Sequence, residues 1–195
     1  MRTTEKGFSL VEMMISTAIL LVVMTGVAGL LVQNAAIARA EQMSAQLQTS
    51  ARSCLAMIVQ VVRSAGWDPR NLGFAPLTLD SAPTSTSNFI EVFADLNEDG
   101  DLLDIDEAVR IRWDGTRIEW RKSSDVTAPY VVLSDAISND ADGDGTPEAM
   151  FVPDSLTAPT SVTIRITARS PVPDPRTGEF IRYTVSSEVA LRTAI

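Results

Sequence analysis

The distribution of hydrophobic residues divides the chain into three regions. Residues 8–32 are apolar almost without interruption, and Glu12 is their only charged residue. About 20 apolar residues suffice to carry a helix across the hydrocarbon core of a membrane. The pattern therefore predicts a transmembrane helix over residues 8–32 that carries one carboxylate.

Residues 33–66 keep a helical period but become amphipathic. Apolar side chains recur at steps of three and four, as in a helix with one buried face: Ile37, Ala40, Leu47, Ala51, Cys54, Ile58, Val61 and Ala65. Gly66 and Pro69 then form a stop signal, because glycine favours a left-handed cap and proline cannot continue a helix. We expect the helix to end near Ala65 and its second half to pack on a domain.

Residues 67–195 are predicted to form a globular β-domain. A proline- and serine-rich connector over 67–87 leads into alternating segments typical of strands, at 88–94, 108–121, 130–134, 161–169 and 180–191. Asp114-Gly115 predicts a two-residue hairpin turn that pairs Ile111 with Ile118, and Arg110 with Glu119. The last two segments are expected to close the same antiparallel sheet. The expected fold class is α+β, a long helix packed against an antiparallel sheet.

Two acidic loops interrupt the predicted sheet. The loop at 95–107 has the oxygen spacing of an EF-hand, with candidate ligands Asp95, Asn97, Asp99, Asp101 and Asp106, and with Glu107 one step after the usual last position. A strand-like segment follows, so an EF-hand proper is not expected. The loop at 140–148 offers Asp140, Asp142, Asp144 and Glu148. Hard oxygen ligands suit Ca²⁺; the alternative for each loop is a solvated acidic turn.

Composition narrows the function classes. The formal net charge of −9 disfavours a nucleic-acid partner. Histidine is absent, which excludes histidine-based triads and histidine-ligated zinc. Cys54 is the single cysteine, so no intramolecular disulfide forms, and its helical position predicts a buried thiol. No nucleotide-binding, metalloprotease or serine-hydrolase motif occurs, and we expect no enzymatic activity.

The residues around the start of the apolar run carry a resemblance. Lys6-Gly7-Phe8-Ser9-Leu10-Val11-Glu12, followed by about twenty apolar residues, resembles the class III signal of type IV prepilins and type II secretion pseudopilins. The resemblance implies that residues 1–7 are a leader, that prepilin peptidase cuts after Gly7, and that Phe8 is methylated. It also implies that Glu12 neutralises the Phe8 amine of a neighbouring subunit. The other interpretation is a signal-anchor helix in which Glu12 has no role.

A second resemblance is more specific. Residues 61–69 together with the Asp-x-Asn-x-Asp-Gly loop are similar to PilW-type minor pilins, which implies a subunit that primes type IV pilus assembly with other minor and major pilins. Such a protein would cross the inner membrane once, hold its C-terminal domain in the periplasm, and then enter the pilus at or near the tip. The alternatives are a J-type minor pseudopilin of a type II secretion system and a calcium-dependent tip adhesin. The paired cysteines common in other pilins are missing here.

Overall fold

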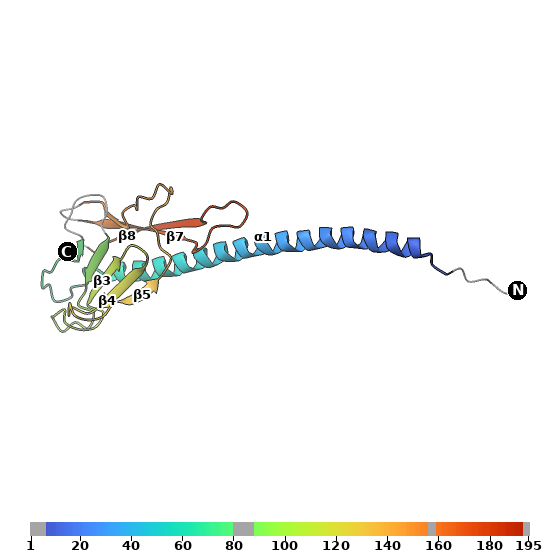
Figure 1. Cartoon of the computed structure of the whole chain (residues 1–195). Helices are drawn as coiled ribbons and strands as arrows, with labels where there is room; N and C mark the ends of the chain where they lie inside the picture. The colour runs from blue at the N-terminus through green and yellow to red at the C-terminus, as the bar shows by residue number, and fades with distance from the viewer. Residues whose placement is uncertain (1–6, 80–87, 156–158, 193–195) are drawn as a thin grey trace. The chain divides into compact units, whose positions relative to one another are not determined.

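One long helix and two antiparallel sheets make up the fold. The structure, a computed structural model, describes residues 7–79, 88–155 and 159–192. The chain divides into two compact units, Met1–Gln42 and Met43–Ile195, and helix α1 (Leu10–Ser64) contributes to both (Figure 1). The α+β class expected from the sequence is confirmed.

The first unit holds the apolar half of α1. Its large apolar side chains are exposed along the whole run: Leu10 is 77% exposed, Leu21 68% and Val32 73%. By length and composition this helix is able to cross a membrane. Nothing else in the described chain covers this surface, so its apolar side chains depend on another apolar environment for burial.

The second unit contains the amphipathic half of α1. The expected buried stripe is confirmed at Leu47, Ala51, Cys54 and Ile58, each 8% exposed or less. Burial raises the pKa of the Cys54 thiol to about 12. The helix ends at Ser64, and Gly66 follows with a φ of 74°, the left-handed conformation that the stop signal predicted.

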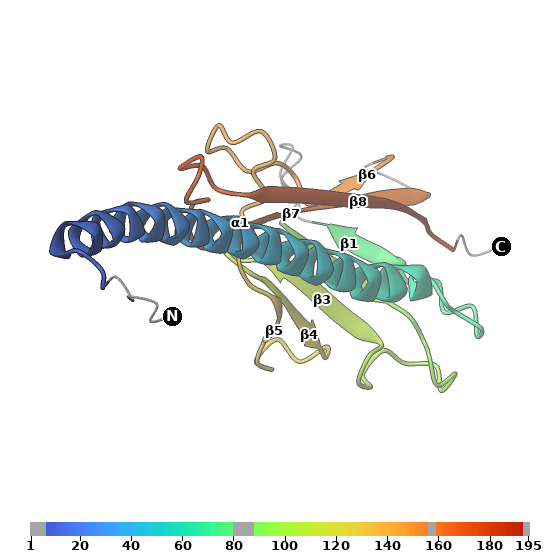
Figure 2. The same cartoon turned by 90° about the vertical axis from the view of Figure 1, so that its right-hand side faces the viewer.

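Two sheets cover this half of the helix. The five-stranded sheet has the order β1-β2-β3-β4-β5 and the three-stranded sheet the order β6-β7-β8, all antiparallel. The strands are β1 (Leu77–Leu79), β2 (Phe89–Phe93), β3 (Ala108–Trp113), β4 (Ile118–Lys122), β5 (Val131–Ser134), β6 (Phe151–Pro153), β7 (Ser161–Arg169) and β8 (Arg182–Ala190). In Figure 2 the three-stranded sheet lies along one side of the C-terminal half of α1 and the five-stranded sheet crosses behind the helix, and one core joins residues of the helix and both sheets.

Two expectations about the sheets are wrong. The last two long strands do not close the first sheet; with β6 they form a separate one. The β3–β4 hairpin is where Asp114-Gly115 placed it, but its register differs by two residues: Ile111 pairs with Trp120, and Arg112 rather than Arg110 meets Glu119. The cause is Asp114, whose carboxylate accepts the N–H groups of both Thr116 and Arg117 and so closes a longer loop.

The connector over 67–87 is only partly described. It contains the short strand β1, which the loop-like composition concealed, while residues 80–87 lie outside the described residues. β6 is likewise three residues long and ends in Pro153, too short for an alternating pattern to reveal.

Candidate functional site

The first candidate site is the start of α1. Gly7 and Phe8 precede the helix, and both are exposed. Ser9 is the N-cap: its Oγ accepts the N–H of Val11 at 3.3 Å, while Glu12 Oε2 accepts the N–H of Ser9 at 3.1 Å. These bonds form a variant of the capping box, in which the Ser9 hydroxyl accepts the second rather than the third backbone N–H of the helix.

The capping box gives Glu12 a second role that the sequence reasoning missed, although the Ser-x-x-Glu spacing was available to reveal it. The carboxylate also lies in the first turn of the helix, where the helix dipole favours a negative charge. Any assembly role for Glu12 must therefore be separated from its role in starting the helix.

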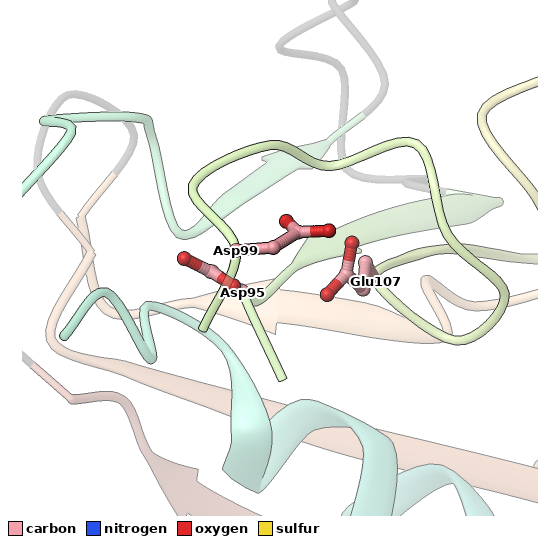
Figure 3. A group of neighbouring side chains, drawn as sticks. All are labelled: Asp95, Asp99 and Glu107. Carbon is pink, nitrogen blue, oxygen red and sulfur yellow. The ribbon is translucent and has the colours of Figure 1, made fainter. Parts of the chain in front are cut away.

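The second candidate site is the loop over 95–107. Asp95, Asp99 and Glu107 each bring a carboxylate oxygen within 4.8 Å of the others, and Figure 3 shows the three side chains converging. Asp95 and Glu107 are buried, at 0% and 1% exposure, whereas Asp99 is exposed. The Asp101 backbone N–H and the Asn97 side chain hold the pKa of Asp99 below its usual value, which favours its charged form.

Hydrogen bonds to backbone N–H groups shape this loop. Glu107 accepts the N–H of Leu96 and of Asn97 through Oε1 and that of Asp104 through Oε2, at 3.0 to 3.3 Å. Asp95 Oδ2 accepts the N–H of Gly100 at 3.2 Å. Buried acidic groups at both ends thus hold the loop closed.

The remaining candidates of this loop are placed differently. Asn97 donates its side-chain amide to Asp99 at 3.0 Å, and Asp101 accepts the N–H of Leu103. Asp106 lies outside the converging group, because its backbone is left-handed, with φ 76°, and its carboxylate contacts Lys122 Nζ at 2.7 Å. Glu107 occupies the closing position that the EF-hand spacing assigned to Asp106.

The loop over 140–148 forms a second acidic group, in which Asp140, Asp142 and Asp144 bring oxygens within 4.8 Å of one another. Asp140 is buried, and its two oxygens accept the N–H groups of Gly143 at 2.6 Å and Gly145 at 3.3 Å. Glu148 lies outside the group and accepts the N–H of Ala141.

An arginine that the sequence reasoning did not single out accompanies each loop. Arg70 packs over Gly100 and acts electrostatically on Asp99 in the first loop. The Arg182 guanidinium lies against Gly143 in the second, 2.8 Å from the position that a Cβ would take. No local sequence pattern pairs these arginines with the loops, because each comes from another part of the chain.

Comparison with known proteins bears on the N-terminal site. Residues 2–28 match the family described as the prokaryotic N-terminal methylation motif. No curated protein and no solved structure matches the chain.

The matched segment supports a relationship to the type IV pilin superfamily, and the α+β architecture is consistent with it. The N-terminus resembles the class III prepilin signal, and one long apolar helix lies directly behind it. The motif supports processing by prepilin peptidase, is consistent with an inner-membrane anchor, and suggests a structural rather than an enzymatic protein.

Proposed function

We propose that this chain is a PilW-like minor pilin, cut after Gly7, methylated at Phe8, and incorporated at or near the tip of a type IV pilus, where it helps to start assembly. One observation carries the proposal: the prepilin motif leads into a helix whose large apolar side chains are exposed as far as Val32. In the inner membrane lipid covers them, with the second unit on the periplasmic side. In a filament the helices of other pilins cover them.

Glu12 provides the specificity of docking in this proposal. A carboxylate within an apolar segment costs about 2.5–3.5 kcal/mol on insertion scales. The Phe8 amine of an adjacent subunit, created by cleavage, offsets that cost when the two charges lie close together. Only a processed neighbour supplies this amine, so the contact selects cleaved subunits.

The first test concerns processing. In cells with an active prepilin peptidase, the wild-type chain should give an intact mass that lacks residues 1–7 and includes one methyl group on Phe8. The Gly7→Val precursor should keep its leader. A Gly7→Val chain that is shortened to begin at Phe8 would contradict the proposal.

The second test separates docking from helix capping. Glutamine at position 12 still accepts the Ser9 N–H and preserves the capping box, but it removes the charge. We expect Glu12→Gln and Glu12→Ala to be processed normally and both to be depleted from sheared pili by at least about tenfold. Recovery of wild-type incorporation in Glu12→Gln would show that Glu12 acts only as a cap.

A further inference from the structure

We propose that the loop over 95–107 binds one Ca²⁺ ion through the carboxylates of Asp95, Asp99 and Glu107, and that this ion fastens the C-terminal end of α1 to the five-stranded sheet. The proposal concerns the second unit and stands independently of the pilin role.

The buried carboxylate of Asp95 points to a ligand. Its side chain is 0% exposed, and while Oδ2 accepts the Gly100 N–H, Oδ1 has no hydrogen-bond partner among the described residues. A buried carboxylate oxygen without a partner is costly, and native proteins rarely leave one unsatisfied. A cation bound by the Asp95 carboxylate would satisfy it.

The charge within the group gives a second reason. Three carboxylate oxygens lie within 4.8 Å of one another, yet within the described ranges no lysine or arginine forms an ion pair with Asp95, Asp99 or Glu107. Partial compensation comes from the Asn97 amide, which donates to Asp99 and, at 2.6 Å, to Asp104, and from Arg70, which acts electrostatically on Asp99 without forming an ion pair. A neutral amide and one arginine outside ion-pair distance offset less negative charge than a bound divalent cation does.

The chemistry of the group selects the ion. All its ligand atoms are oxygens, which favours Ca²⁺ or Mg²⁺ over the softer transition metals. The ligands are spread over a loop that turns at three left-handed residues, Glu98 with φ 64°, Gly100 with φ 93° and Asp106 with φ 76°. Such a loop suits Ca²⁺, which accepts six to eight oxygens in adaptable geometry, better than Mg²⁺, which demands a near-ideal octahedron.

The position of the loop gives the ion a structural consequence. The Asp95 N–H bonds the carbonyl of Trp67 at 2.8 Å, and the Gly66 N–H bonds the carbonyl of Phe93 at 2.9 Å. The first proposed ligand is therefore hydrogen-bonded directly to Trp67, in the segment that follows the end of α1 at Ser64. Binding an ion at Asp95 would stabilise this junction as well as the loop.

The test uses the full chain in detergent micelles, stripped of metal with a chelator and then titrated with CaCl₂ by calorimetry. We expect one ion per chain with a Kd of about 0.1–1 mM, as in extracellular calcium modules. We also expect a higher Tm in Ca²⁺ than in Mg²⁺ at the same concentration. Absence of both binding heat and a Tm increase at about 10 mM Ca²⁺ would overturn the proposal.

Two matched variants locate the ion. Asp99 and Asp142 are both exposed, so neither Asp99→Asn nor Asp142→Asn removes a buried group. Asp99→Asn should weaken Ca²⁺ binding by at least about tenfold, while Asp142→Asn should bind like the wild type. Unchanged affinity in Asp99→Asn, or loss of binding in Asp142→Asn alone, would refute a site at 95–107.

Discussion

The two acidic loops share a sequence pattern but differ in how completely they satisfy their own carboxylates. Each begins with a buried aspartate, at Asp95 or Asp140, followed by aspartates or an asparagine that accept the N–H two residues further on. In the loop over 140–148 both oxygens of the first aspartate accept glycine N–H groups. In the loop over 95–107 only one does, and the other has no partner among the described residues.

This difference shows what an EF-hand-like spacing specifies. Alternating acidic residues turn a loop tightly because their side chains bind nearby backbone N–H groups, with or without an ion. The spacing alone therefore does not distinguish a metal site from a self-satisfied turn. A metal site is indicated by a buried carboxylate oxygen that has no partner after the backbone N–H groups of the loop are bonded. Among the described residues of the two loops, the first loop has such an oxygen at Asp95.

The largest expected effect comes from Glu107, the glutamate whose carboxylate holds the first loop closed. Glu107→Ala removes the acceptor of three backbone N–H groups in the first loop, and we expect a loss of about 3 kcal/mol, because unsatisfied buried groups cost about 1–3 kcal/mol each. Thermal unfolding without Ca²⁺ should show a Tm lower by roughly 6–12 °C.

The matched change in the second loop is Glu148→Ala, which removes the acceptor of the Ala141 backbone N–H and should cost about 1 kcal/mol. Glu107→Gln, which keeps one acceptor oxygen, should fall between the wild type and Glu107→Ala. Equal Tm losses in Glu107→Ala and Glu148→Ala would show that the loops close in the same way.

A middle-sized effect is expected at the glycines of the second loop. Gly143 and Gly145 have nearly the same left-handed φ, 87° and 88°, so alanine is strained at both, by about 1–2 kcal/mol. At Gly143 the added Cβ would also meet the Arg182 guanidinium, whereas at Gly145 it meets open space. Gly143→Ala should therefore have the lower Tm. A lower Tm for Gly145→Ala would rule out a supporting role for Arg182.

The smallest expected effect is the pH dependence from Asp99. Its pKa is lowered in the folded chain, so its charged form contributes stability that is present above the usual aspartate value of 3.8 and is lost as the pH falls through the lower folded pKa. Without Ca²⁺, the Tm of the wild type should exceed that of Asp99→Asn near neutral pH, and the two should converge as the pH falls from 3.8 through the lower folded pKa. A difference that persists in acid would assign the effect to something other than this charge.

The sequence predicted the elements of the fold better than their pairing. The spacing of hydrophobic residues predicted α1 and the long strands, and β7 has the bounds 161–169 that the alternating pattern indicated. The β3–β4 register was mispredicted because the Asp114 side chain lengthens the turn. The separation into two sheets also escaped prediction, because alternation shows that a strand has a buried face but not what that face packs against.

The candidate sites show the same limit. The apolar run and the motif around Gly7 stood out in the sequence because the N-terminal methylation motif is a local pattern along the chain. The sequence did not reveal that Glu107, and not Asp106, joins Asp95 and Asp99. That outcome depends on the left-handed backbone at Asp106 and on its contact with Lys122, which lies on a strand beyond the loop. Residue spacing does not encode contacts between separate elements.

The buried thiol of Cys54 has a practical consequence for following this molecule. As the single cysteine of the sequence, with its pKa raised to about 12, it reacts slowly with alkylating reagents while the folded core encloses it. Its labelling rate therefore measures how often the second half of α1 separates from the sheets. Under the proposed function, the rate recorded in the membrane and again in sheared filaments would report at a single atom whether assembly loosens or tightens the fold.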